Sequence, residues 1–190
     1  MKTQLLISIK IILFFTVLTG IIYPLLITGT SQLIFHDKAN GSFINKDNLR
    51  VGSSLIAQMF TDDRYFWPRP SAIGYNPLPS GGSNLSATSK ILKESVENQR
   101  FDFIIKNRLP VGTIVPAEMI FASGSGLDPH ISIESARLQS GRVAGARGIS
   151  QQKVLELIEK FKDNRQFGIL GEPRINVLLL NMELDSQNLN

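Results

Sequence analysis

The organisation of this chain follows from the stretch IILFFTVLTGIIYPLLITGTSQLIF, residues 11–35, which contains no charged side chain. About 20 apolar residues are enough for a helix to cross the ~30 Å hydrocarbon core of a membrane. Pro24, Gly20 and Gly29 would weaken a helix in water. Membrane spans tolerate such residues because neighbouring groups satisfy the freed backbone. We therefore expect one transmembrane helix over 11–35.

A cleaved signal peptide is the alternative interpretation, since Lys2 and Lys10 resemble the positive region that opens such a peptide. The apolar part of a signal peptide has only about 7–15 residues and ends at a small-x-small cleavage site. The apolar stretch here is longer, and Thr28-Gly29-Thr30 is a poor cleavage site. An uncleaved anchor is the favoured interpretation, and membrane lipid is the first expected partner.

The charges that flank the span predict its orientation, because positive residues collect on the cytoplasmic side. Lys2 and Lys10 precede the span, whereas His36, Asp37 and Lys38 follow it. We expect residues 1–10 to form a short cytoplasmic N-terminus. In a bacterium this is a single-pass protein of the inner (plasma) membrane with a periplasmic or extracellular soluble domain.

The composition excludes several classes of function. The net charge is +4 and the basic residues are scattered, which argues against a nucleic-acid partner. The chain has no cysteine, so disulfides, thiolate catalysis and cysteine-bound metal sites are excluded.

Beyond the span, the pattern predicts one extracytoplasmic α+β domain with few strands. Residues 36–50 are polar and contain Gly41, which indicates a linker. The soluble domain is expected over 51–185, and a frayed polar tail over 186–190. The expected fold class is therefore a single N-terminal transmembrane helix plus one α+β extracytoplasmic domain.

Apolar spacing and capping residues predict the elements of this domain. Helical spacing predicts a helix over 51–60, and the proline- and glycine-rich segment 61–84 predicts a long structured loop. Three further helices are expected: one over 86–106 capped by Ser86 or Thr88, one from Ser132 to Arg147 ended by Gly148, and one beginning at Ser150.

Two apolar segments complete the expected domain. The short stretch 115–122 is consistent with a strand or with one buried turn. Residues 174–184 are β-prone, and we expect them to form the central strand of a small sheet.

A search for catalytic chemistry finds one weak constellation. Ser123 or Ser125, with His130 and Asp128, could form a serine hydrolase site, although the nucleophile motif Gly-x-Ser-x-Gly is only superficially matched. The simpler interpretation is that Asp128 closes a turn and that backbone bonds hold His130. Only two histidines occur, His36 and His130, far apart in the sequence, so no zinc site is predicted.

The sequence evidence for a nucleotide-binding site is similarly weak. No Walker A loop is present. The stretch Ser80-Gly81-Gly82-Ser83 offers flexible backbone amides before an expected helix, where anions are attracted. A tight turn explains the same residues.

Several ordered motifs nevertheless resemble a known family. They are Tyr65-Phe66-Trp67-Pro68-Arg69-Pro70-Ser71-Ala72, Tyr75-Asn76, Ser80-Gly81-Gly82-Ser83-Asn84-Leu85, Ala122-Ser123-Gly124-Ser125-Gly126-Leu127-Asp128-Pro129-His130-Ile131-Ser132, Arg142-Val143-Ala144, Ala146-Arg147-Gly148 and Leu170-Gly171-Glu172-Pro173-Arg174-Ile175-Asn176-Val177. With the span, and in this order, they resemble the C subunit of the Kdp high-affinity potassium-transporting ATPase of bacteria. The resemblance runs from the span to about Asp185. The sequence departs from the family at Leu85-Ser86-Ala87-Thr88, where the family has Gly-Pro before the Thr, and at Ser83.

The resemblance implies a non-catalytic accessory subunit, needed for the assembly and activity of an ATP-driven potassium uptake complex. The implied partners are a channel-like subunit that handles potassium, a P-type subunit that hydrolyses ATP, and a very small subunit. It also implies a catalytic chaperone that raises the ATP affinity of the pump subunit through residues 80–83, which resemble a transporter signature but have Ser83 in place of its Gln. No cofactor other than ATP is implied.

The predicted orientation favours a different role, because a domain outside the cell membrane meets no ATP. Such a domain would instead cover the outer potassium entrance of the channel-like subunit. A membrane-anchored hydrolase and a stand-alone binding protein are the alternatives. We expect the motif residues to shape the domain or to contact partners: Tyr65, Phe66, Trp67, Arg69, Pro70, Ser123, Gly124, Ser125, Gly126, Asp128, Pro129, His130, Gly171, Glu172, Pro173, Arg174 and Asn176.

Overall fold

The computed structural model describes residues 1–46 and 49–186, and the chain divides into two units, Met1–Ser53 and the part that begins at Ser54. The expected tail over 186–190 and the expected linker over 36–50 therefore each fall in part outside the described residues. Each unit is described by itself.

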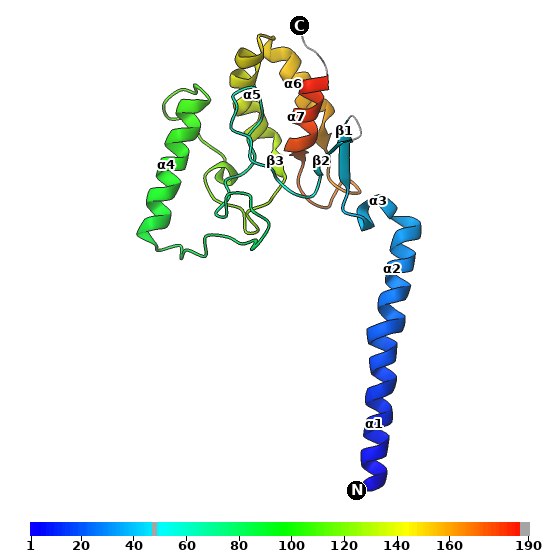
Figure 1. Ribbon diagram of the computed structural model, residues 1–190. Helices are drawn as coiled ribbons and strands as arrows, with labels where there is room; N and C mark the ends of the chain where they lie inside the picture. The colour runs from blue at the N-terminus through cyan, green and yellow to red at the C-terminus, as the bar shows by residue number, and fades with distance from the viewer. Residues whose placement is uncertain (47–48, 187–190) are drawn as a thin grey trace. The chain divides into compact units, whose positions relative to one another are not determined.

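The first unit contains one long apolar helix, Lys2–Ile34, which is long and apolar enough to cross a membrane (Figure 1). It consists of α1 (Lys2–Val17), a π-helical turn (Leu18–Ile22) and α2 (Tyr23–Ile34). The Tyr23 amide donates to the Leu18 carbonyl, one residue further back than in an α-helix. This wider turn lies directly before Pro24, whose ring would otherwise press on the preceding turn.

Two threonine hydroxyl groups of this helix bond to its own backbone. Thr19 Oγ1 donates to the Phe15 carbonyl at 2.7 Å, and Thr30 Oγ1 donates to the Leu26 carbonyl at 2.9 Å. Such bonds satisfy these two hydroxyls in an apolar surrounding. The helix therefore extends the predicted span of 11–35 toward the N-terminus and fits a hydrocarbon environment.

A short helix and a hairpin complete the first unit. The helix is α3 (His36–Ala39), and β1 (Phe43–Lys46) pairs antiparallel with β2 (Leu49–Ser53). The stretch expected as a linker thus contains regular structure. Ser53 Oγ donates to the Gly41 carbonyl at 2.7 Å, and the Arg50 guanidinium lies 3.8 Å from the centre of the Phe43 ring.

The helix predicted over 51–60 is wrong. Residues 49–53 form β2, and no helix follows before α4 among the described residues. Leu55, Ile56 and Met59 are exposed, so the helical spacing faces no core. The Ala57 amide instead donates to the Leu127 carbonyl at 2.9 Å, so it is not available for a helical hydrogen bond within the segment.

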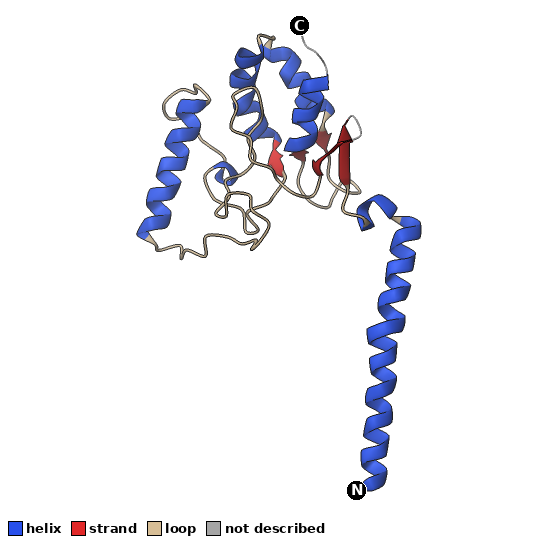
Figure 2. Ribbon diagram, viewed as in Figure 1, coloured by secondary structure: helices blue, strands red, loops and turns tan. Residues whose placement is uncertain are grey.

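Among the described residues, the second unit contains four α-helices and a small antiparallel sheet, confirming an α+β domain with few strands. The sheet order is β3 (His130–Ser132), β5 (Arg174–Asn176) and β4 (Lys162–Asp163). Figure 2 shows α5 (Ile133–Arg147), α6 (Gln151–Lys160) and α7 (Val177–Ser186) gathered together, with the short strands at one end of the group. The core includes Phe66, Ile131, Val143, Ile158, Ile175 and Leu180.

One helix of this unit begins and ends where the sequence predicts, and a second begins where it predicts. Ser132 Oγ accepts the Ser135 amide at the start of α5, and Gly148 ends that helix in the left-handed region at φ 66°. Ser150 Oγ accepts the Lys153 amide at the start of α6.

One helix starts later than predicted, and one short segment adopts the second of its two expected forms. Helix α4 (Lys90–Lys106) is capped by Ser89, whereas Ser86 and Thr88 bond to each other. A 3-10 turn (Ala117–Met119) occupies the segment that was consistent with a strand or a turn.

The strand predicted over 174–184 ends at Asn176, where α7 begins. Asn176 Oδ1 accepts the Leu179 amide at 3.1 Å and so caps the helix. The central position of this strand in the sheet is confirmed.

Candidate functional site

The long loop over 61–84 is irregular, as predicted, and two buried amides clamp it to the helices. The Phe66 amide donates to Asn181 Oδ1 at 2.8 Å, and Asn181 Nδ2 returns a bond to the Phe66 carbonyl at 2.9 Å. The Trp67 amide likewise donates to Gln139 Oε1 at 2.8 Å, and Gln139 Nε2 donates to the Trp67 carbonyl at 3.2 Å. Each side-chain amide thus supplies the hydrogen bonds that a neighbouring strand would otherwise give to the loop backbone. The buried peptide groups are therefore satisfied.

Arg142 of α5 ties the same loop down from another side. It is 3% exposed, and its guanidinium donates to the Asp63 and Tyr65 carbonyls, to Asn107 Oδ1 and to Gln139 Oε1. The group also lies 3.5 Å from the centre of the Trp67 ring. Burial lowers the pKa of Arg142 to about 10, so the side chain is still a cation at neutral pH.

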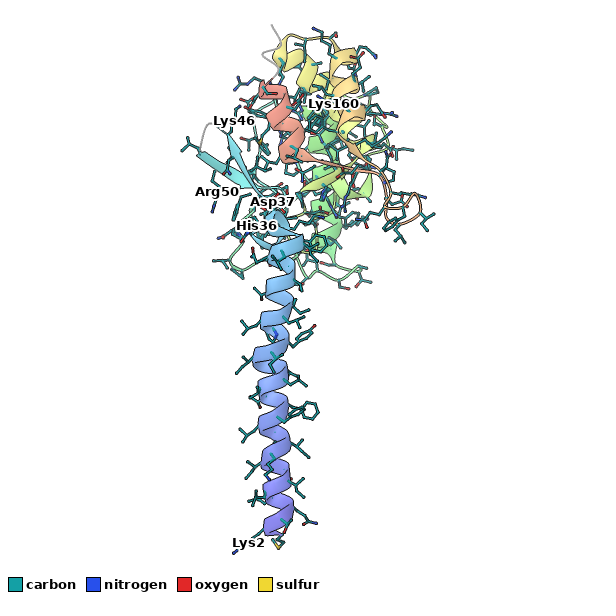
Figure 3. All side chains as sticks on the ribbon, turned by 90° about the vertical axis from the view of Figure 1, so that its right-hand side faces the viewer. Lys2, His36, Asp37, Lys46, Arg50 and Lys160 are labelled. Carbon is teal, nitrogen blue, oxygen red and sulfur yellow. The ribbon has the colours of Figure 1, made fainter. Side chains whose placement is uncertain are left out.

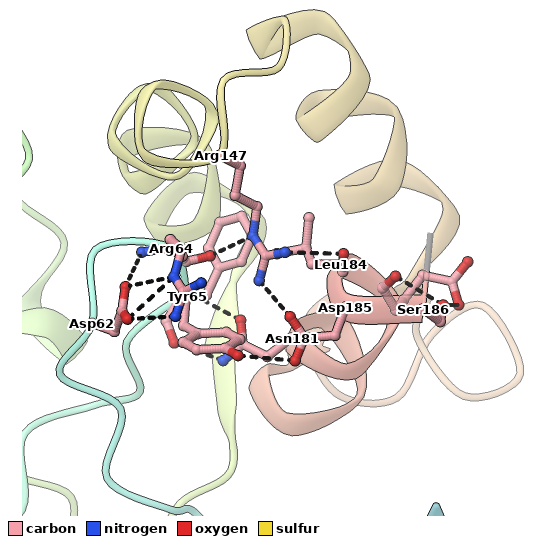
Figure 4. A network of polar contacts seen from close by, with 10 residues as sticks. Asp62, Arg64, Tyr65, Arg147, Asn181, Leu184, Asp185 and Ser186 are labelled. Carbon is pink, nitrogen blue, oxygen red and sulfur yellow. Dashed lines mark hydrogen bonds and ion pairs between the residues drawn. The ribbon is translucent and has the colours of Figure 1, made fainter. Parts of the chain in front are cut away.

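A second arginine network fixes Tyr65 and the end of α7 (Figure 4). Arg147 donates to the Arg64 carbonyl at 2.7 Å and to the Leu184 carbonyl at 3.0 Å, and it pairs with Asp185 at 2.8 Å. Tyr65 Oη donates to the same Asp185 carboxylate at 2.9 Å. The three aromatic residues that open the loop motif are therefore held by α5 and α7 together.

The two glycine-rich motifs lie against each other. The Gly81 amide donates to the Ser125 carbonyl at 3.1 Å, and a Cβ on Gly82 would lie 3.3 Å from the Gly124 carbonyl. A Cβ on Gly126 would lie 2.5 Å from Ile73 Cγ1, and Gly126 itself has a φ of +69°. The glycines are needed for this close approach of two loops.

The turn over 123–130 is also hydrogen-bonded to other parts of the domain. The Ser123 amide donates to the Pro70 carbonyl at 3.1 Å, and the Val177 amide donates to the Pro129 carbonyl at 2.9 Å. Ser123, Gly126 and Pro129 are buried, whereas Gly124 and Ser125 are exposed. We call residues 66–84 and 122–130 the loop platform.

Asp128 closes the end of the platform. Its Oδ1 accepts the His130 amide at 3.0 Å, and its Oδ2 accepts Arg69 Nη1 at 2.8 Å. Burial raises the pKa of Asp128, but bonds from His130 and then Arg69 outweigh burial and lower it to about 2. The carboxylate is therefore an anion at neutral pH, and it joins the two loops.

Arg69 is itself positioned by Tyr75, whose Oη donates to the Arg69 carbonyl at 2.8 Å. Burial raises the pKa of Tyr75 to about 12, so the phenol keeps the proton that it donates.

A polar hollow of about 250 Å³ lies beside Asp128 and joins two motifs that are distant in the sequence. Its lining includes Glu118, Asp128, His130, Ser132, Glu172, Pro173 and Arg174. Glu118 Oε1 is occupied by the Ser132 amide at 2.7 Å and by the Ser135 hydroxyl. Gly171 is exposed, and Asn176 Nδ2 donates to the Ser54 carbonyl at 2.7 Å.

Comparisons with known proteins agree with the motifs. The family model described as "KdpC: K+-transporting ATPase, c chain" matches residues 5–186. The chain belongs to the KdpC family. A protein of Mycobacterium bovis named "Potassium-transporting ATPase KdpC subunit" is 47% identical over 187 residues, which cover 97% of this chain and 99% of that protein.

Proteins of the same name from two other bacteria are equally similar. That of Geobacter metallireducens is 46% identical over 184 residues, covering 94% of this chain and 95% of its own. That of Myxococcus xanthus is 50% identical over 172 residues, covering 89% and 81%. The predicted resemblance is confirmed, and the apolar helix of this KdpC-family chain indicates a membrane protein.

In the described part of this KdpC-family chain, the hydrolase geometry is not formed around Ser125. Ser125 Oγ accepts the Leu127 amide at 3.1 Å, and no hydrogen bond joins Ser125 to His130 in the described part of the chain. A nucleophile needs its base within hydrogen-bond reach. Across residues 1–46 and 49–186, no group of three or more histidine or acidic residues is placed to hold a metal ion.

Sequence reasoning missed Gln139 and Asn181, and it named Arg142 and Arg147 only within family motifs, without their part in clamping the loops. Asn181 interrupts the apolar run Val177-Leu-Leu-Leu-Asn181, and Arg142 lies beside Val143 in a helix of small residues. A single polar residue inside an apolar stretch is a usable signal, because it is buried only with defined partners.

Proposed function

We propose that this chain is a non-catalytic accessory subunit of an ATP-driven potassium uptake complex, needed for its assembly and activity. The observation that carries the proposal is the use made of the family motifs. Their glycines, backbone amides and charged side chains join the loops to one another and to the helices. These contacts give a membrane-anchored domain a well-defined loop surface. Rigid exposed loops on a scaffold are where proteins place their contacts.

The proposed partners are a channel-like subunit that handles potassium, a P-type subunit that hydrolyses ATP, and a very small subunit. We propose the bacterial inner membrane as the location, with residues 1–10 in the cytoplasm. Lys2 marks one end of the apolar helix and His36 and Asp37 follow the other (Figure 3). The excess of positive charge on the Lys2 side supports this orientation.

Of the two roles open to the domain, we propose the covering of the outer potassium entrance. The backbone of Gly81 and Gly82 is packed on the turn over 123–126, which supports a structural use of residues 80–83. The alternative, raising the ATP affinity of the pump subunit, requires nucleotide binding by those residues. Equilibrium binding of ATP to the purified full-length chain in detergent tests this choice, and saturable binding that Gly82→Val abolishes would contradict the covering role.

The accessory role is tested by separating complex yield from turnover. Asp128→Ala removes the joint between Arg69 and His130, so it is expected to lower the yield of complex and to leave the turnover of assembled complex close to that of the wild type. Asp128→Asn keeps an oxygen for the His130 amide and serves as the intermediate control. Normal yield with collapsed turnover would contradict the proposal.

A further inference from the structure

A hollow of about 420 Å³ lies between α4 and the long loop, within the second unit. Figure 1 shows α4 standing apart from α5, α6 and α7. Of the 17 residues of α4, only Phe103 is buried. The helix thus covers the loop without filling the space beside it, and the hollow that remains has the size of a small-molecule site.

The deep part of this hollow is apolar and aromatic. Phe103 of α4 and Met119 line it and are 6% and 4% exposed. The rings of Phe60, Trp67 and Tyr75 also line it. The face of an aromatic ring attracts cations, and several such rings around one hollow are the usual means of binding an organic ammonium group.

The charged side chains of the lining are mostly acidic. Asp63 comes from the loop and Asp102 from α4, so two carboxylates reach the same hollow from different elements. The one cation of the lining, Lys106, lies 3.3 Å from Asp102 and is matched by it. The Asp63 carboxylate has no hydrogen bond or ion pair within the described residues, although the charge of the buried Arg142 attracts it.

Arg142 leaves room for a second cation. Its guanidinium does not line the hollow, since it lies against the Trp67 ring at 3.5 Å and donates to four oxygen acceptors. The acidic excess of the lining is therefore available to a ligand, and Asp63 is the carboxylate with the least competition for it.

The same lining excludes other classes of ligand. A phosphate or carboxylate group would be repelled by Asp63 and Asp102. A bare metal ion needs several oxygen ligands around it, whereas the buried part of this hollow offers ring carbons and a thioether.

We propose that this hollow binds a small organic cation, with its ammonium group beside Asp63 and Asp102 and its apolar body against the aromatic rings. The site goes beyond the accessory role, because it is formed by this chain alone and requires no partner subunit.

The experiment uses choline as the probe and Trp67 as the reporter, since Trp67 is the single tryptophan of the chain and lines the hollow. The full-length chain in non-ionic detergent is titrated with choline chloride, and potassium chloride of equal ionic strength serves as the reference. The expected result is a saturable change in fluorescence with a Kd of about 1 mM or below. The uncharged analogue, in which carbon replaces the choline nitrogen, should bind about tenfold more weakly. No saturation below about 10 mM, or equal affinity for the two compounds, would overturn the site.

Asp63→Asn is expected to weaken choline binding about tenfold, because it removes the charge and keeps the backbone carbonyl that Arg142 uses. Asp163→Asn is the matched control, since Asp163 is an exposed aspartate of β4 outside the lining, and it should change the Kd less than about twofold. Equal effects of the two variants would contradict the proposal.

Lys106→Met gives a test that misfolding cannot imitate. It removes the cation that competes for Asp102, so choline binding should become about threefold tighter. Unchanged or weaker binding by Lys106→Met would count against an ammonium group beside Asp102.

Discussion

Replacing the buried Arg142 is expected to be among the most destabilising single changes in the domain. Arg142→Met keeps the aliphatic packing and removes all four hydrogen bonds to Asp63, Tyr65, Asn107 and Gln139. Gln139 Oε1 keeps the Trp67 amide as a donor, but Asn107 is 3% exposed and its oxygen is left without one.

The size of the effect follows from these contacts. An unsatisfied buried acceptor costs about 1–3 kcal/mol, and the loss of the guanidinium from the Trp67 ring adds about 1–2 kcal/mol. Detachment of the loop at Asp63 and Tyr65 adds to both. We expect the free energy of unfolding to fall by about 3–5 kcal/mol, the range seen when a buried charged network loses one member.

The assay is urea unfolding of the full-length chain in detergent, followed by tryptophan fluorescence. The chain contains one tryptophan, Trp67, so the signal comes from the ring on which Arg142 lies. Arg137→Met is the matched control on the same helix, because the Arg137 side chain is 58% exposed and, within the described residues, its ion pair is with Glu159 alone. It should cost at most about 1 kcal/mol, as exposed ion pairs do. A loss below about 1 kcal/mol for Arg142→Met, or equal losses for the two variants, would refute the reasoning.

Two further outcomes follow from the loop platform. Gly126→Ala should lower the free energy of unfolding by about 2–4 kcal/mol, because the new Cβ meets Ile73 and the backbone has a positive φ. In the control Gly124→Ala the new Cβ meets none of the described atoms within 4 Å, so the loss should be about 1 kcal/mol or less. Equal losses in a urea titration would contradict the close packing of the two glycine-rich loops. Because bonding lowers the pKa of Asp128 to about 2 from 3.8, the ionised carboxylate stabilises the fold above pH 4 by about 2 kcal/mol, and this advantage over Asp128→Asn should disappear as the pH falls toward 2. A difference between the two proteins that does not change over this pH range would show that the carboxylate charge is not the cause.

Local cues in the sequence were enough for several elements of the fold. The ends of α5 and the start of α6 could be predicted from Ser132, Gly148 and Ser150, because capping depends on residues within one turn of the helix end. The apolar stretch was similarly sufficient for the long N-terminal helix, since length and hydropathy are properties of the segment itself.

The errors arose where tertiary contacts decide the local structure. The spacing of Leu55, Ile56 and Met59 is helical, yet the segment is held open by a bond from Ala57 to Leu127, which sequence spacing does not reveal. In α7, the run of β-prone residues concealed the cap supplied by Asn176. Propensity is a weak guide when a single capping residue or a distant loop makes the difference.

The candidate site was predicted as a set of motifs but not as an arrangement. Residues 81–82 and 124–126 are more than forty positions apart, and only the fold shows that the glycines of one motif accommodate the backbone of the other. The amide clamps of Gln139 and Asn181 are equally non-local. Such pairings require knowledge of which loops meet, so the sequence indicated the importance of these residues without their mechanism.

The most direct test of the accessory-subunit role is purification of the tagged full-length chain in mild detergent from potassium-starved cells, with mass spectrometry of the recovered proteins. The role predicts stoichiometric recovery of a P-type ATPase subunit and a channel-like potassium subunit. Recovery of the chain alone across several detergents would contradict it.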